Sequence, residues 1–104
     1  MRELNNREEL ELAVSTKTPH LVWYSARWCG PCRRINADAI QIAATAAHVT
    51  FVHCDVDKVS MAVHLHSISR IPTFVLFCEG REIQRLGSSD TAEIVAWLAR
   101  VGKV

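Results

Sequence analysis

Two cysteines separated by two residues carry the clearest chemistry in this sequence. They lie in the run Trp28-Cys29-Gly30-Pro31-Cys32, after an apolar stretch at 21–24 and at the start of a helical pattern. Side chains at positions i and i+3 of a helix share one face, with Cβ atoms about 5–6 Å apart. A small local adjustment therefore brings two such sulfurs to bonding distance. The spacing predicts a pair that alternates between two thiols and one disulfide.

The place of the pair at a helix start favours an ionised first thiol. Unpaired backbone N–H groups there carry partial positive charge, which lowers the pKa of a nearby thiol below the value of about 8.5 for free cysteine. Pro31 suits the first helical turn, where its missing N–H would be unbonded, and Gly30 lets a partner backbone approach closely. We expect Cys29 to be an exposed nucleophile and Cys32 to be the resolving thiol.

A C-x-x-C pair also occurs in zinc knuckles and in inert structural disulfides, and both remain alternatives. Zinc requires two further ligands, usually a second closely spaced pair. Neither Cys54 nor Cys78 has a cysteine neighbour, so redox chemistry is favoured and no metal is expected. Cys54 and Cys78 lie in strand patterns, where free cysteine behaves as a small apolar residue.

Composition places the chain among ordinary globular proteins. It has 104 residues, of which 49% are hydrophobic and 22% charged, and we expect one domain spanning 1–104. The net charge of +1 indicates neither nucleic-acid nor membrane binding. The polar start lacks the apolar segment of a signal peptide, and no apolar run approaches the ~20 residues of a membrane span. We expect a soluble, cytoplasmic monomer, whose cysteines serve catalysis in a reducing compartment.

The elements that would position the cysteines alternate along the chain. The nearly apolar run His20–Ser25 predicts a central strand covered on both faces, and an alanine-rich helical pattern runs from Pro31 to about His48. Asparagine and aspartate three residues before glutamates predict capped helix starts near Asn6 and Asp90. The remaining expected elements are a short edge strand at the N-terminus, strands at 49–55, 74–78 and 81–86, and a short helix from an N-cap at Asp57 to about 66. The last two strands would form an antiparallel hairpin, whereas the strands joined by the cysteine helix would be parallel.

This order of elements, with W-C-G-P-C at the first strand-to-helix junction, resembles the thioredoxin family over nearly the whole chain. Further matching points are Ile71-Pro72-Thr73 before a strand, Asp55-Val56-Asp57, Gly80 and Gly87. The resemblance implies the α/β thioredoxin fold, a central mixed sheet of four to five strands flanked by helices on both faces. It also implies a dithiol–disulfide oxidoreductase that reduces protein disulfides through the Cys29/Cys32 couple and binds no cofactor.

The resemblance assigns further roles. Cys29 would attack a substrate disulfide to form a mixed disulfide, which Cys32 would resolve, and Pro72 would be a cis-proline facing the cysteines. The implied docking residues are Trp28, Ile71, Pro72, Thr73, Gly87 and Ser88. The implied partners are disulfide proteins such as ribonucleotide reductase and peroxiredoxins, with a flavoprotein thioredoxin reductase using NADPH, or a small dithiol, as electron donor. A non-catalytic binding module of the same fold is the alternative.

The chain departs from the family pattern beneath the second cysteine. Family members usually have a buried aspartate six residues before the first cysteine, where this chain has Trp23. The resemblance implies that such a carboxylate takes the proton of the resolving thiol, whereas tryptophan donates one N–H and accepts nothing. Either resolution proceeds without a buried carboxylate, or Trp23 simply fills core volume. His53 replaces the family's nearby lysine and could accept a proton or merely pack, and Ala37 replaces a kinking proline, so a straighter helix is expected.

Overall fold

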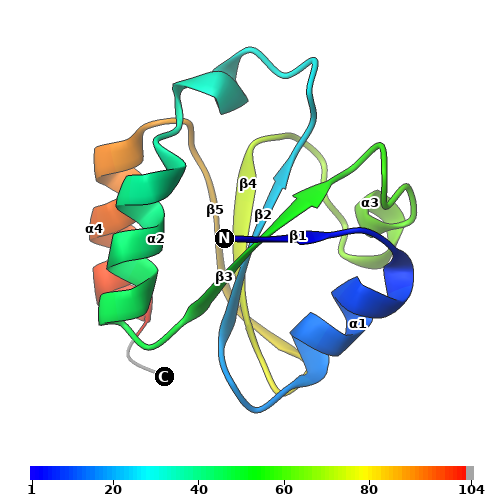
Figure 1. The fold of residues 1–104 in the computed structure, drawn as a ribbon, viewed down its shortest axis with the longest axis horizontal. Helices are drawn as coiled ribbons and strands as arrows, with labels where there is room; N and C mark the ends of the chain where they lie inside the picture. Colours follow the sequence, from blue (N-terminus) through cyan, green and yellow to red (C-terminus); the bar gives the residue numbers. More distant parts are fainter. Residues whose placement is uncertain (103–104) are drawn as a thin grey trace.

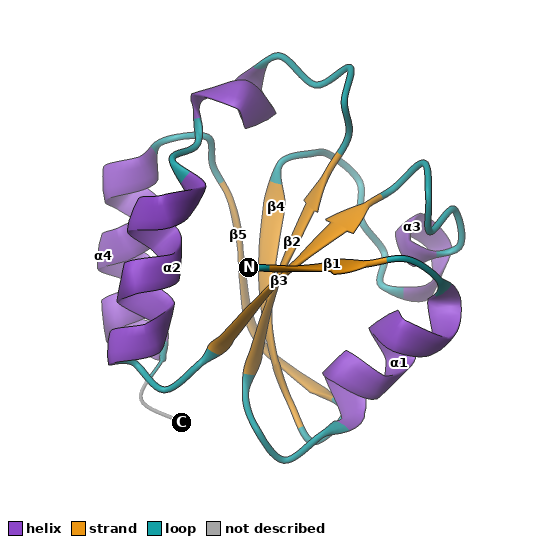
Figure 2. Ribbon diagram, in the orientation of Figure 1, coloured by secondary structure: helices purple, strands orange, loops and turns teal. Residues whose placement is uncertain are grey.

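The computed structural model describes residues 1–102, so the last two residues of the expected 1–104 domain lie outside the described part. It contains a five-stranded mixed sheet with helices on both faces (Figures 1 and 2). The strands are β1 (Arg2–Leu4), β2 (His20–Ser25), β3 (Thr50–Asp55), β4 (Thr73–Cys78) and β5 (Arg81–Gly87). The helices are α1 (Arg7–Ser15), the 3₁₀ helix η1 (Pro31–Arg34), α2 (Ala37–Ala46), α3 (Ala62–Leu65) and α4 (Thr91–Val101).

The strand order β1-β3-β2-β4-β5 places β2 at the centre of the sheet. Strand β3 runs parallel to both β1 and β2, whereas β4 is antiparallel to β2 and to β5. All six residues of β2 are buried, as a strand covered on both faces requires. The predicted mixed sheet, the parallel pair and the terminal hairpin are therefore confirmed, and the first residues do form an edge strand.

Two apolar clusters cover the two faces of the sheet. Helices α2 and α4 lie side by side over one face, and α1 and α3 lie over the other (Figure 1). Alternate residues of β2 divide between the clusters, with Leu21 and Trp23 facing α2 and α4, and Val22 and Tyr24 facing α1 and α3. The cysteine pair belongs to the α2/α4 side, so this face positions the site.

Two helix starts are capped as the sequence predicts. The side chain of Asn6 accepts a hydrogen bond from the Glu9 backbone N–H at 2.9 Å, and that of Asp90 accepts one from the Glu93 N–H at 3.2 Å. Each bond satisfies a backbone donor that has no partner inside the helix.

The prediction of one long, straight helix from Pro31 to about His48 is wrong. The helix breaks at Ile35, whose backbone is extended, and α2 begins only at Ala37. The physical reason is Asn36, whose side-chain oxygen accepts from the Ala39 N–H at 3.2 Å and so starts a new helix. The second cysteine therefore lies in the single turn of η1 and not in a long helix.

The short helix after β3 also differs from its prediction. It spans only Ala62–Leu65, with Met61 as its N-cap, so Asp57 is not its cap. Asp57 instead belongs to a tight turn, in which its N–H donates to the Asp55 carboxylate at 2.8 Å. An aspartate two residues earlier satisfies this N–H locally, which favours a turn over a helix start. Gly87, expected in a loop, is the last residue of β5.

Candidate functional site

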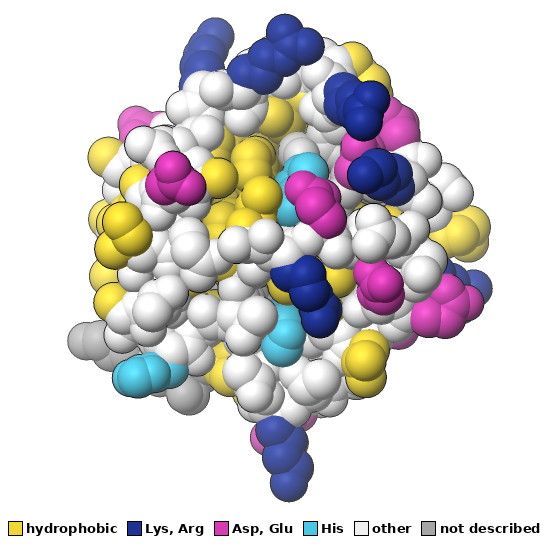
Figure 3. Space-filling model, in the orientation of Figure 1, with side chains coloured by type: hydrophobic (Ala, Val, Ile, Leu, Met, Phe, Trp, Pro, Cys, Tyr) yellow, Lys and Arg dark blue, Asp and Glu magenta, His cyan; other side chains and the backbone are white. Residues whose placement is uncertain are grey.

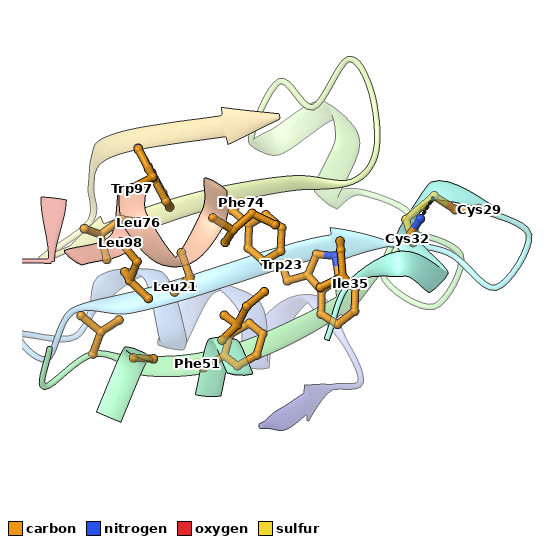
Figure 4. Packing of buried hydrophobic residues seen from close by; sticks show 14 of the residues in the cluster. Leu21, Trp23, Cys29, Cys32, Ile35, Phe51, Phe74, Leu76, Trp97 and Leu98 are labelled. Atoms are coloured by element: carbon orange, nitrogen blue, oxygen red, sulfur yellow. Dashed lines mark hydrogen bonds between the residues drawn. A yellow bond between two sulfur atoms is a disulfide. The ribbon is translucent and has the colours of Figure 1, made fainter. Parts of the chain in front are cut away.

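The cysteine pair lies beyond the carboxyl end of β2 and is joined as a disulfide. The two Cα atoms are 5.3 Å apart, within the range that a disulfide requires. Cys29 is only 3% exposed and Cys32 only 6%, so the expectation of an exposed nucleophile is wrong for this disulfide state. Both sulfurs lie at the edge of the apolar cluster under α2 and α4, next to Ile35 (Figure 4).

The turn between the cysteines directs a backbone donor at the first sulfur. The Cys32 N–H points at Cys29 Sγ over 3.2 Å, drawn as a dashed line in Figure 4. The peptide groups of η1 are otherwise held by local bonds, such as the one from the Arg33 N–H to the Gly30 carbonyl at 3.0 Å. Because η1 is only one turn long, the donor that reaches Cys29 Sγ is the Cys32 N–H, in place of the N-terminus of the long helix that the sequence predicts.

Trp28 stands out from the surface beside the disulfide. Its side chain is 67% exposed, yet its indole N–H donates to Asp57 Oδ2 at 3.0 Å. That bond ties the motif to the turn after β3. Exposed basic side chains gather at the top of the molecule in the view of Figure 3. In the cysteine turn, Arg33 Nη2 donates to the Arg27 carbonyl at 2.9 Å.

The second predicted docking segment precedes β4. The Ile71–Pro72 peptide bond is cis, as the resemblance implies, and half-buried Ile71 packs against the cluster that contains both cysteines. Thr73 pairs with Gly87 across the hairpin and donates its hydroxyl to the Arg70 carbonyl at 2.6 Å. A Cβ on Gly87 would lie 4.0 Å from the Pro72 carbonyl oxygen, so these two residues are neighbours. The Ser88 hydroxyl hydrogen-bonds to the Glu93 carboxylate in the first turn of α4 and accepts from the Asp90 N–H.

Trp23 fills the core where the family pattern has a carboxylate. Its ring stacks with Phe74 and with Phe51, at centroid distances of 5.8 and 6.2 Å (Figure 4). Its indole N–H is buried and has no hydrogen-bond partner within the described residues. The side chain therefore packs and has no acceptor to offer Cys32.

Beside Trp23, three polar side chains form a connected group that sequence reasoning did not assemble. His53 Nδ1 lies 2.8 and 2.7 Å from the two carboxylate oxygens of Glu3, and Ser25 Oγ hydrogen-bonds to His53 Nε2. These three residues and Cys32 line one cleft of about 540 Å³. Figure 3 shows an apolar hollow between α2 and β1, with a histidine and an acidic side chain at its edge. The only signal in the sequence was a serine at the end of the apolar run of β2. The pairing of Glu3 with His53 depends on the register of β1 and β3, which the structure supplies.

The two other cysteines lie away from this site. Cys54 is buried in β3, where burial above all, and then the charges of Asp55 and Glu3, raise its pKa to about 12. Cys78 is half-buried and donates its S–H to the Lys17 carbonyl at 3.3 Å. No group of three or more His, Cys, Asp or Glu side chains in residues 1–102 is arranged to hold a metal ion. None of the helices in that range is both long and apolar enough to cross a membrane.

Comparison with known proteins gives one consistent result. The thioredoxin family model matches residues 2–100. A thioredoxin of Chlamydia trachomatis is 32% identical over 81 residues, which are 77% of this chain and 79% of that protein. An H-type thioredoxin of Nicotiana tabacum is 34% identical over 87 residues, covering 84% of this chain and 69% of that protein. The solved structure of Fasciola hepatica thioredoxin superposes with a TM-score of 0.83 at 29% identity, over 97% of this chain and 99% of that one.

Proposed function

Because the chain belongs to the thioredoxin family, we propose that Cys29 attacks substrate disulfides and Cys32 resolves the mixed disulfide that results. Family membership and the bonded Cys29–Cys32 pair make the protein a dithiol–disulfide oxidoreductase. The roles of the individual side chains go beyond that statement and rest on the geometry of the pair.

The observation that carries the assignment is the Cys32 N–H directed at Cys29 Sγ over 3.2 Å. When the disulfide is reduced, a donor held on one sulfur stabilises negative charge on that sulfur. The thiolate is the attacking form, so the donor selects Cys29 as the nucleophile. Cys32 instead borders the cleft behind the turn, which suits a thiol that attacks second.

The proposed reaction transfers two electrons from the cysteine pair to the substrate. The Cys29 thiolate attacks one substrate sulfur, an S–S bond forms between them, and the other substrate sulfur leaves as a thiolate. Cys32 then loses its proton and attacks Cys29 Sγ, which forms the Cys29–Cys32 bond and releases the second substrate thiolate. A reductant outside the chain returns the pair to its dithiol form.

Six residues would bind the substrate beside the sulfurs, as an extended peptide added to a sheet edge. They are Trp28, Ile71, Pro72, Thr73, Gly87 and Ser88. The exposure of the Trp28 indole and the lack of a side chain on Gly87 next to Pro72 support this arrangement. Because the Ser88 hydroxyl is already held by Glu93 and the Asp90 N–H, Ser88 would contribute its backbone.

The proposed partners are those of the family. We propose disulfide proteins such as ribonucleotide reductase and peroxiredoxins as substrates, with an NADPH-dependent thioredoxin reductase or a small dithiol as donor. The protein would work as a cytoplasmic monomer that binds no cofactor, in electron transport and cell redox homeostasis.

Two measurements test the assignment. In an insulin-reduction assay with dithiothreitol, the wild type accelerates precipitation, whereas Cys29→Ser does not. Cys32→Ser, reduced and freed of reductant, retains disulfide-linked partners from a lysate whose protein disulfides are intact, and Cys29→Ser does not. A wild type without reductase activity would favour a non-catalytic module, and trapping through Cys32 instead of Cys29 would reverse the proposed roles.

A further inference from the structure

Glu3, His53 and Ser25 form a continuous hydrogen-bonded chain that crosses three neighbouring strands. Glu3 pairs with His53 between β1 and β3, and Ser25 lies on β2, two residue pairs beyond the pair that joins His53 to Trp23. The bonds run from the Glu3 carboxylate to His53 Nδ1 and from His53 Nε2 to Ser25 Oγ. These three side chains belong neither to the cysteine pair nor to the proposed docking residues.

The partners of the imidazole determine which nitrogen carries the proton. A carboxylate only accepts hydrogen bonds, so Nδ1 must be the protonated nitrogen that donates to Glu3. Nε2 is then unprotonated in the neutral ring and accepts from the Ser25 hydroxyl. A proton delivered through Ser25 would therefore arrive at a free lone pair, and the resulting imidazolium would lie against a carboxylate 2.7 Å away.

Cys32 borders the same cleft of about 540 Å³ as these three residues. It has to lose a proton before it can attack Cys29, because only a thiolate is nucleophilic. Trp23, which forms another part of the wall, has no acceptor. The cleft is open to solvent, so a water molecule can carry the proton from Cys32 to Ser25.

We infer that Ser25 and His53, with Glu3 as the positioning residue, take the proton of Cys32 while the mixed disulfide is resolved. This inference rests on the proposed roles of Cys29 and Cys32. The Cys32 S–H bond breaks, and its proton passes through water to Ser25 Oγ, which hands its own proton to His53 Nε2. The sulfur's electron pair forms the bond to Cys29 Sγ, and the substrate leaves as a thiolate. The imidazolium then returns its proton to solvent.

Other charged groups surround the cleft and bear on its pH dependence. Besides Glu3 on β1 and Cys32 on η1, these are Arg27 and Arg33 near the motif, Asp55 on β3 and Lys58 in the turn after it. Asp55 is the competing acceptor. One of its oxygens already accepts from the Asp57 N–H, whereas the lone pair of His53 Nε2 is reached through a hydroxyl that can itself relay a proton.

The test separates attack from resolution in one stopped-flow experiment. Reduced protein is mixed with 5,5′-dithiobis(2-nitrobenzoate) in a Cys78→Ala background across pH 5–9. Attack by Cys29 releases one coloured thiolate, and resolution by Cys32 releases the second. We expect His53→Gln and Ser25→Ala to slow the second release at least about tenfold at pH 7, with the first release unchanged. The pH profile of the second release should lose its histidine inflection in His53→Gln.

Further variants keep the inference falsifiable. Glu3→Gln leaves an acceptor for Nδ1 but removes the negative charge beside the imidazolium, so it should slow the second release and leave the first unchanged. The exposed His64→Gln is the matched control and should match the wild type. A second release within twofold of wild type in both His53→Gln and Ser25→Ala would overturn the inference, as would loss of the inflection in Asp55→Asn but not in His53→Gln. Absence of the first release in the parent protein would instead refute the role of Cys29.

Discussion

The indole of Trp23 and the imidazole of His53 face each other across β2 and β3, with ring centroids 4.7 Å apart and planes inclined by 54°. The indole therefore forms one wall for the imidazole, whose two nitrogens are held by Glu3 and Ser25. Trp23, which offers Cys32 no acceptor, thus helps to fix the orientation of His53, which can accept a proton.

The packing of Trp23 gives a prediction about stability. Trp23→Phe keeps the stacking on Phe51 and Phe74 and removes a buried N–H that has no partner within the described residues. The smaller ring buries less apolar area, which lowers stability, whereas removal of an unpaired buried donor raises stability by about 1–3 kcal/mol. These two effects should nearly cancel. We expect an unfolding free energy within about 1.5 kcal/mol of wild type, whereas Trp23→Ala should lose about 3–5 kcal/mol. Urea denaturation of the disulfide form measures both, and equal losses for Phe and Ala would contradict this account.

The bond from Trp28 to Asp57 predicts a defect in substrate binding. Asp57→Ala frees an indole that is 67% exposed and otherwise held at 3.0 Å by the carboxylate. An exposed hydrogen bond of this kind is worth about 1 kcal/mol, so KM for a protein disulfide should rise roughly three- to fivefold. The rate with a small chromogenic disulfide should change less than twofold, because a small substrate does not need the indole. Glu8→Ala, an exposed acidic change on α1, serves as control, and an equal effect on both substrates would exclude a docking role.

Elements with strong local signals were predictable from the sequence. The apolar run of β2, the cysteine motif and the caps at Asn6 and Asp90 all lie where the sequence places them. In each case the signal is a property of neighbouring residues, such as a continuous apolar stretch or a capping side chain three residues before a glutamate.

The features that sequence analysis missed depend on competition between local signals or on contacts between residues far apart in the sequence. The helical pattern after Pro31 hid the break at Asn36, because the alanine-rich stretch that follows suits a helix and the capping side chain decides only locally where that helix begins. The chain from Glu3 to Ser25 could not be assembled without the register of β1, β3 and β2, which joins residues 50 and 28 positions apart. The burial of Cys29 follows from Ile35 and the cluster around it, which no local pattern reveals.

The two cysteines outside the motif should differ in reactivity. With a pKa of about 12, Cys54 has a thiolate fraction of about 10⁻⁴ at pH 8, and its burial also blocks access. We expect iodoacetamide to label native Cys54 at least about tenfold more slowly than half-buried Cys78, measured by peptide mass spectrometry on reduced protein. In urea both should react at similar rates, and rapid labelling of native Cys54 would refute its assignment as a buried core residue.

On the opposite face of the sheet, His66 lies in a different environment from His53. The Tyr24 hydroxyl and His66 Nδ1 share a hydrogen bond of 2.5 Å, and burial lowers the pKa of the imidazole. Glu11 and Glu82 oppose that shift, and Arg85 adds to it. Because burial also raises the pKa of Tyr24, the phenol stays protonated and brings no negative charge to the imidazole, and the folded protein favours the neutral form of His66.

This arrangement predicts acid-sensitive stability with a definite sign. As pH falls below about 6.5, the ordinary pKa of histidine, the unfolded chain takes up a proton at His66 that the folded chain refuses. Stability is therefore full above that pH and falls by at most about 1.4 kcal/mol per pH unit below it, until the lowered folded pKa is reached. Urea denaturation from pH 7.5 to 5 should show this slope in wild type and in His64→Gln, an exposed control two residues away, but not in His66→Gln. If His66→Gln kept the wild-type slope, another group would have to supply it.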